Sequence, residues 1–301
     1  MQTSPPPPAP DRPDARGDDT GRESSLLRAL RERNSFPIMV ELRPPLAGLD
    51  RDDRIDAWID LQDATGRFVR DGHWILLTDD AVGEAEEENL GHSLANLPPD
   101  VPRDRIVPIL TCKHPLDYCL LYAKRASAAG IETLTVVGGD PGGPPRCVPH
   151  AYVLRERLRA TVPGVSLAGW ANPHREADEQ FGFLESDFHA GLSLTQIVTE
   201  DSLGHLEELA SRIERAGLDL PLVAGVFHFH NANPRRLRTL GRFFPVPAEK
   251  ITRAYASGVE PDTYTANAIR AARDAGARAV YVSNLGITGG PRRLRRILER
   301  V

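Results

Sequence analysis

Eight short apolar segments recur along the chain, and most are apolar at consecutive positions rather than at every second one. Such runs are typical of strands that are buried on both faces, as in parallel sheets. The segments are residues 38–42, 74–78, 106–111, 132–137, 165–170, 194–198, 221–227 and 278–283. Helical spacing of apolar residues fills the intervals at 51–70, 115–129, 175–190, 201–216 and 261–276. The alternation predicts an α/β protein with a parallel sheet.

Eight strands that alternate with helices over this length fit a (β/α)8 TIM barrel. The alternative is a doubly wound open sheet, which often carries a G-x-G-x-x-G turn after its first strand. No such turn follows residues 38–42. We therefore expect one barrel domain over residues 21–301. It begins with a short helix at 21–33 and follows a disordered Pro-rich tail at 1–20.

The composition excludes several other classes of protein. A net charge of −5 argues against a nucleic-acid-binding protein, which normally has a basic face. No apolar run approaches the ~20 residues of a membrane span, and the N-terminus lacks the apolar core of a signal peptide. Cys112, Cys119 and Cys147 are too few and too scattered for a disulfide framework. We expect a reduced, cytoplasmic protein.

Glu41 is an acid at the end of the first apolar run. The segment 37–45 reads PIMVELRPP, so the carboxylate follows three apolar residues and precedes two prolines. Proline cannot continue a hydrogen-bonded ladder, so the chain turns there. Because the chemistry of such barrels takes place at the carboxyl ends of the strands, Glu41 is expected at the mouth.

Polar and aromatic residues also follow the other strands. They are Thr78, Asp79 and Asp80; Thr111; Gly138, Gly139 and Asp140; Trp170, Asn172 and His174; Gln196; Phe227, His228 and His230; and Ser283 and Asn284. This mixture is typical of a small-molecule pocket. Purely structural roles are open for several members, such as helix caps for Thr78 and Thr111 and a turn for Asp140 before Pro141.

His228 and His230 form an H-x-H pair that suggests an alternative function. On a strand both imidazoles would face inward, and His174 or Glu41 would supply the third ligand of a zinc site. A metal-dependent barrel hydrolase is therefore the alternative. H-x-H alone is a weak signal, and the preferred interpretation is a mouth without a metal.

Five motifs occur in a fixed order along the chain: V-E-L-R-P-P, L-T-C, G-G-D-P, A-N-P-H-R-E-A, and A-G followed by T-Q at 195–196. Together they resemble the methylenetetrahydrofolate reductase family over about residues 36–286. The resemblance implies a (β/α)8 barrel that reduces 5,10-methylenetetrahydrofolate to 5-methyltetrahydrofolate, in one-carbon metabolism and methionine biosynthesis. In that family FAD usually carries the hydride from NAD(P)H to the folate.

The resemblance also implies roles for individual residues. Glu41 matches the catalytic acid, and Asp140 matches an aspartate near flavin and pterin. Gln196 matches a glutamine that contacts folate, and we place Phe227 and Thr111 with it as substrate-binding residues. The residues expected to bind the cofactor are Thr78, Gly139, Trp170 and His174.

These residue types suit the chemistry. The five-membered ring of the substrate opens to an iminium ion before hydride adds, and protonation of a ring nitrogen assists the opening. A carboxyl group at a partly apolar mouth has its pKa raised by desolvation and can supply that proton. A carboxylate such as Asp140 can stabilise the cation, and Gln196 offers a donor and an acceptor to the pterin.

The chain departs from the family where the flavin binds. Ile109 replaces a histidine and Gly138 an arginine, and Glu185, Ser186 and Asp187 stand where the family has basic residues. Acids near a diphosphate repel it. We therefore hypothesise that NADH or NADPH delivers hydride directly, with Trp170 stacked on the nicotinamide and without FAD.

A catalytically inactive folate-binding protein is a further alternative. The expected partners are a folate and a nicotinamide dinucleotide, with no nucleic acid and no membrane. The absence of a basic pair placed for a 2′-phosphate favours NADH. The sequence does not fix the oligomeric state or the direction of the reaction.

Overall fold

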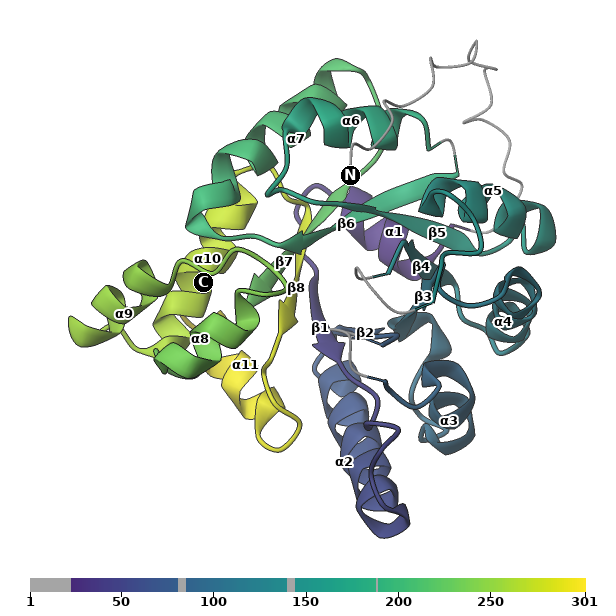
Figure 1. Cartoon of the computed structure of the whole chain (residues 1–301), viewed down its shortest axis with the longest axis horizontal. Helices are drawn as coiled ribbons and strands as arrows, with labels where there is room; N and C mark the ends of the chain where they lie inside the picture. The colour runs from purple at the N-terminus through teal and green to yellow at the C-terminus, as the bar shows by residue number, and fades with distance from the viewer. Residues whose placement is uncertain (1–22, 81–84, 140–143, 188) are drawn as a thin grey trace.

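The structure is a computed structural model and describes residues 23–80, 85–139, 144–187 and 189–301. The predicted barrel is confirmed: eight strands of the described chain form a closed barrel in sequence order (Figure 1). The strands are β1 (Ile38–Leu42), β2 (Trp74–Leu77), β3 (Ile106–Thr111), β4 (Thr133–Val137), β5 (Ser166–Ala171), β6 (Ala190–Ile197), β7 (Leu222–Phe227) and β8 (Ala279–Ser283). The expected tail at 1–20 lies outside the described residues.

All neighbouring strands are parallel, and β8 closes on β1 with Met39 beside Tyr281. The register is irregular along β6, once against β5 and again against β7 between Leu194 and Ile197. Such irregularities bend a strand and redirect its side chains near a rim. The strand that carries Gln196 is therefore distorted where it reaches the mouth.

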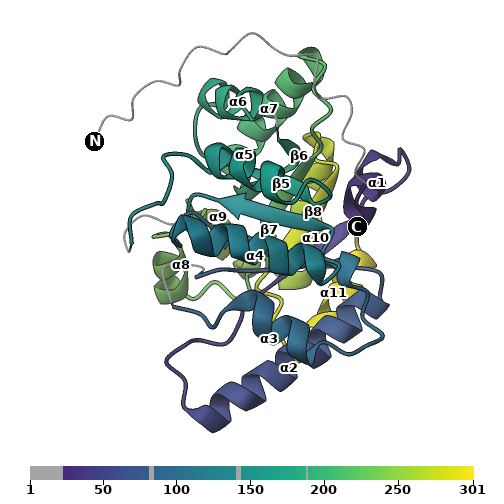
Figure 2. The ribbon, with the colours of Figure 1, turned by 90° about the vertical axis from the view of Figure 1, so that its right-hand side faces the viewer.

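Helices surround the barrel (Figures 1 and 2). They are α1 (Ser25–Arg31), α2 (Arg51–Arg70), α3 (Asn89–Asn96), α4 (Leu116–Ala128), α5 (Ala151–Thr161), α6 (Ala177–Glu185), α7 (Leu203–Arg215), α8 (Pro234–Leu240), α9 (Ala248–Ala256), α10 (Pro261–Asp274) and α11 (Gly290–Leu298), with short 3-10 turns η2 (Arg103–Arg105) and η3 (Glu200–Ser202). Within the described chain, every helix is too short or too polar to cross a lipid bilayer.

Inward and outward side chains alternate along each strand. On β1, Val40 and Leu42 pack outward against the helices, whereas Met39 faces the barrel interior with Leu76 and Tyr281. By the same period of two, Glu41 points inward one layer above Met39. The alternation of side chains along β1 therefore places Glu41, the first predicted acid, on the inward side near the mouth.

Helix α1 closes the opposite end of the barrel. Leu26, Leu27 and Leu30 are buried in the same cluster as the inward residues of the strands. Arg278, the residue before β8, also donates to the carbonyls of Leu30 and Glu32. With the amino-terminal end plugged, small molecules reach the interior from the carboxyl end of the strands.

One predicted helix is wrong at its end. Residues 175–190 were expected to be helical, but α6 ends at Glu185 and β6 starts at Ala190, four residues before the expected strand. Residues 190–193 form part of the strand because they are buried in the barrel: Leu192 faces the interior and Ser193 is fully buried. Helices α3, α5, α8, α9 and α11 were not predicted from the sequence.

Candidate active site at the barrel mouth

Glu41 and Ser283 meet where β8 closes on β1. The Ser283 hydroxyl donates a hydrogen bond to Glu41 Oε1. Burial is the main cause that raises the pKa of the Glu41 carboxyl, and the charge of Glu86 raises it further. The Ser283 hydrogen bond and the charge of Arg43 oppose that rise. Glu41 is therefore a carboxyl group that keeps its proton to higher pH than an exposed glutamate does.

Glu86 is a second acid beside Glu41 that sequence reasoning missed. Its side chain is only 1% exposed. Arg43 Nε donates to one of its oxygens at 2.7 Å, and Thr78 Oγ1 donates to the other at 2.8 Å. The residue belongs to the acidic stretch EAEEE at 84–88, which reads as a solvated surface run. No local signal separates the buried member of such a run from its neighbours.

Asp79 links the ends of β2 and β3. Its carboxylate accepts the Thr111 backbone N–H at 2.7 Å and lies 2.9 Å from His114 Nε2. The hydrogen bond that Asp79 accepts from the His114 ring is the main cause that raises the pKa of His114. Thr111 is the last residue of β3, where the sequence placed it, and Asp79 accepts its backbone N–H.

Trp170 and Gln196 lie near the carboxyl ends of β5 and β6, and Tyr281 lies deeper, in the barrel interior beside Met39. The rings of Trp170 and Tyr281 lie 6.2 Å apart, and the Tyr281 hydroxyl donates to the Thr195 carbonyl at 2.7 Å. A side chain at Gly225 would meet the Tyr281 hydroxyl, so this glycine makes room for the phenol. Gln196 Oε1 accepts the Ile197 backbone N–H, which leaves its amide N–H2 as the donor for a ligand.

The exit of β4 lies beneath two basic side chains. Arg146 donates to the carbonyls of Gly138 and Gly139 at 2.7 and 3.3 Å. The Lys113 stem lies where a side chain at Gly139 would be, and Gly139 has φ of +76°. Arg146 thus holds the backbone carbonyls at the β4 exit, where Gly138 itself carries no side chain. Asp140, the second predicted catalytic acid, lies outside the described residues.

Asp187 does not face the mouth as an unpaired charge. Arg155 Nε, from α5, donates to its carboxylate at 2.5 Å, and the two side chains are 5% and 1% exposed. Asp187 is therefore neutralised and cannot repel a diphosphate, contrary to the sequence argument. Ser186 bonds back to the Gly182 carbonyl on α6, and Ile109 is buried inside the barrel.

The histidines do not converge on one point. β7 ends at Phe227, so His228 lies beyond the strand and contacts Thr265 Oγ1 of α10 at 2.8 Å. The arrangement that the metal alternative requires, with both imidazoles of the H-x-H pair inward from one strand, is therefore not found. Burial lowers the pKa of His228 to about 4, and the nearby His230 ring lies 4.7 Å away.

The third ligand of the metal alternative is also engaged elsewhere. His174 Nε2 lies 2.7 Å from the Ile197 carbonyl, and Glu41 is bonded to Ser283. Among the described residues, no group of three or more His, Cys, Asp or Glu side chains is arranged to hold a metal ion.

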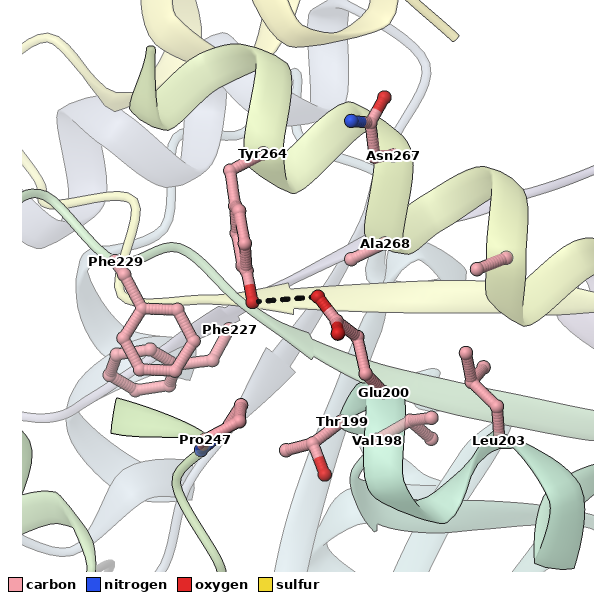
Figure 3. Close-up of a pocket in the computed structure, with 11 residues that line it drawn as sticks. Val198, Thr199, Glu200, Leu203, Phe227, Phe229, Pro247, Tyr264, Asn267 and Ala268 are labelled. Carbon is pink, nitrogen blue, oxygen red and sulfur yellow. Dashed lines mark hydrogen bonds between the residues drawn. The ribbon is translucent and has the colours of Figure 1, made fainter. Parts of the chain in front are cut away.

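A cavity of about 170 Å³ opens beside the mouth, between the ends of β6 and β7 and helix α10 (Figure 3). Phe227, Phe229 and Tyr264 form its aromatic wall, with the rings of Phe229 and Tyr264 6.3 Å apart. The Tyr264 hydroxyl points toward Glu200 at 3.4 Å. Because Phe227 of β7 pairs in register with Ser283 of β8, the cavity wall lies next to the strand whose Ser283 bonds Glu41 of β1.

Comparisons with known proteins show the fold alone. No protein-family model and no curated protein matches the chain. An uncharacterized protein from Clostridium thermocellum, described as binding two copies of 5-methyl-5,6,7,8-tetrahydrofolic acid, is similar in structure, with a TM-score of 0.57 and 9% identity over 91% of this chain and 96% of that one. A single-site variant of mandelate oxidase with benzoyl-formic acid is similar with a TM-score of 0.54 and 15% identity over 90% of this chain and 74% of that one. The chain thus shares the barrel fold with these proteins.

Proposed function

We propose that this barrel binds a reduced folate at its mouth and reduces 5,10-methylenetetrahydrofolate to 5-methyltetrahydrofolate with NADH. The observation that carries the proposal is Glu41, an inward-facing, partly buried carboxyl group bonded to Ser283. The order of sequence motifs supports the same reaction. Similarity to a protein described as binding 5-methyltetrahydrofolate supports a folate as the ligand.

Glu41 acts as the general acid. In its protonated form it gives a proton to a nitrogen of the five-membered ring, and the adjacent C–N bond breaks. The methylene carbon then belongs to an iminium ion, and hydride from the dihydronicotinamide converts it to a methyl group. One proton and one hydride are consumed, and the dinucleotide leaves oxidised. General acid catalysis of this kind contributes about 10²- to 10⁴-fold.

We propose that FAD takes no part in the reaction, since the chain departs at several positions from the flavin-binding pattern of the family that it resembles. Ile109 offers no hydrogen bond and Gly138 no side chain. Asp187 is paired with Arg155 and Ser186 bonds to its own helix, so neither supplies the positive charge that the resembled family has at these positions. We propose that hydride passes directly from NADH, with Trp170 at the β5 exit as the surface on which the nicotinamide stacks.

The test combines cofactor identification with one substitution. The purified chain is denatured and its supernatant scanned for flavin absorption, and NADH oxidation is followed with methylenetetrahydrofolate present. We expect no stoichiometric flavin, folate-dependent oxidation, and a loss of about 100-fold or more in Glu41→Gln. A stoichiometric yellow cofactor rules out direct transfer but not the reaction. Full activity of Glu41→Gln rules out the general acid.

A non-catalytic folate-binding protein is the second candidate, because the similar Clostridium protein is described only by what it binds. Binding of 5-methyltetrahydrofolate in calorimetry, without any NADH oxidation across pH 5–9, favours this candidate.

A further inference from the structure

His228 contacts the carboxyl end of β8 through its backbone. Its N–H donates to the Ser283 carbonyl at 3.0 Å, and its own carbonyl accepts the Asn284 side-chain amide at 2.9 Å. These two hydrogen bonds form a clamp between residue 228 and residues 283–284. The clamp lies at the mouth, where β7 and β8 run side by side with Phe227 opposite Ser283 (Figure 1).

The clamp acts at the point where the other neighbour of β8 no longer pairs with it. The ladder between β1 and β8 ends with Val40 beside Val282, one residue before Ser283. The Ser283 backbone is therefore held from the β7 side, while its hydroxyl reaches across to Glu41 on β1. The direction of that hydroxyl depends on how firmly β7 holds the backbone.

Asn284 turns the chain sharply after Ser283. Its φ is +63°, in the left-handed region that most side chains avoid and that asparagine tolerates better than most. Such a conformation persists where the surrounding contacts determine it. Here the amide bond to the His228 carbonyl is that contact, so it fixes the residue next to Ser283.

Helix α10 fixes His228 in turn. The His228 side chain is 1% exposed, and its Nδ1 lies 2.8 Å from Thr265 Oγ1. The Thr265 hydroxyl donates its single proton to the Pro261 carbonyl at 3.0 Å, so Nδ1 donates to Thr265. The clamp is thus anchored on a helix outside the barrel.

We propose that Asn284 and His228 are positioning residues that aim the Ser283 hydroxyl at Glu41. The inference rests on the proposed function for its purpose, because Glu41 is the proposed general acid. It gives the H-x-H segment a use that needs no metal: the backbone of its first histidine holds the strand end, and the ring of that histidine anchors the backbone.

The experiment follows the Ser283–Glu41 hydrogen bond through the titration of Glu41. The full chain is labelled with ¹³C-glutamate, and the Glu41 carboxyl signal is identified by its loss in Glu41→Gln. A hydrogen bond donated to a carboxylate favours the ionised form, so weakening the bond raises the titration midpoint. Ser283→Ala reports its complete loss, for which we expect a rise of roughly one pH unit.

Asn284→Gly removes the amide and still accommodates the left-handed backbone. We expect the Glu41 midpoint to rise by about half a pH unit or more, because the Ser283 hydroxyl is no longer aimed. Asn231→Gly, at an exposed residue of the segment after β7, is the matched control and leaves the midpoint unchanged.

The double variant Ser283→Ala/Asn284→Gly separates positioning from a general loosening of the mouth. If Asn284 acts through the Ser283 hydroxyl, the double variant titrates within about 0.3 pH units of Ser283→Ala alone. A purely structural role of Asn284 would add its own shift in both backgrounds. The charged groups around Glu41 are the same in every variant of this cycle.

The anchor on α10 supplies an independent pair of variants. Thr265→Val removes the oxygen that accepts from the His228 ring, whereas Thr265→Ser keeps a hydroxyl there. We expect the Glu41 midpoint to rise in Thr265→Val and to stay at the wild-type value in Thr265→Ser.

A wild-type midpoint in folded Asn284→Gly overturns the proposal, and so does an Asn284→Gly shift that persists in full in the Ser283→Ala background. If Asn284→Gly does not fold, the Thr265 pair decides, and equal midpoints in its two variants overturn the proposal. None of these outcomes depends on turnover. A chain that never oxidises NADH but shows the predicted midpoints loses the proposed reaction and keeps the positioning residues.

Discussion

The Ser283 hydroxyl donates to Glu41 across the β8–β1 seam, so the residue that completes the barrel also holds its candidate acid. The hydrogen bond favours the ionised carboxylate and lowers its pKa, against the larger effect of burial. A serine that opposes proton retention keeps the acid able to release its proton once substrate has bound. The Ser283–Glu41 hydrogen bond thus both joins β8 to β1 and lowers the pKa of the candidate acid.

Removal of this contact shifts the pH profile upward. In Ser283→Ala the pKa of Glu41 rises, because the hydrogen bond that lowers it is lost. Glu41 then stays protonated to higher pH, and the alkaline limb of kcat/KM for folate reduction moves to higher pH. The measurement is a steady-state profile from pH 5 to 9. Ser193→Ala, a buried serine on β6, is the control, and a downward shift in Ser283→Ala contradicts the assignment.

Glu41 is expected to lower the stability of the fold near neutral pH. Its folded-state pKa lies above its ordinary value of 4.5. Between those two values the folded chain binds more protons than the unfolded chain, so the free energy of unfolding falls as pH rises. The cost is absent below about pH 4.5 and complete above the folded-state pKa.

Glu41→Gln removes that cost. The variant should therefore have a higher Tm than the wild-type chain at pH 8, and the difference should vanish towards pH 4.5. Thermal unfolding followed by circular dichroism at both pH values tests this. A variant that is less stable at pH 8 shows that the folded chain favours the carboxylate.

The buried pair of Arg155 and Asp187 should be essential to the fold. Asp187→Asn leaves Arg155 buried without its counter-charge, at a cost of about 3–5 kcal/mol in the free energy of unfolding. Urea denaturation at pH 7 measures the loss. The matched control is Asp63→Asn, whose partner Arg67 lies 2.9 Å away with both side chains more than half exposed, and we expect about 0.5 kcal/mol or less there. Equal losses in the two variants contradict the buried-pair argument.

The barrel was predictable because strands that are buried on both faces have consecutive apolar residues, as in Ile75–Leu77 and Ile106–Leu110. The position of Glu41 was predictable for the same reason, since a period of two and a pair of prolines place it at the mouth. Both inferences use only local sequence and the geometry of a strand.

Contacts between distant segments were not predictable. Asp187 reads as a charge near a ligand until Arg155 is seen beside it, 32 residues away along the chain. Glu86 is one acid in a run of acids, and its burial depends on the turn at Pro45. His228 follows β7 as expected, but the sequence does not show that its imidazole contacts Thr265 of α10, 37 residues away. Each error concerns a partner that local pattern does not specify.

The cavity beside Phe227 gives the last prediction. Phe227 pairs with Ser283, which bonds Glu41, so two strand spacings, roughly 10 Å, separate the acid from the aromatic wall. A folate with its pterin at Glu41 would direct its aryl ring toward this wall.

Ala268→Phe fills the cavity from α10 and should raise the folate KM about tenfold, the equivalent of ~1.4 kcal/mol, with kcat changed less than about twofold. Ala256→Phe, exposed on α9 outside the cavity, is the control and should leave both constants unchanged. A folded Ala268→Phe variant with the wild-type folate KM places the aryl ring elsewhere, whereas a raised KM for NADH alone assigns the cavity to the dinucleotide.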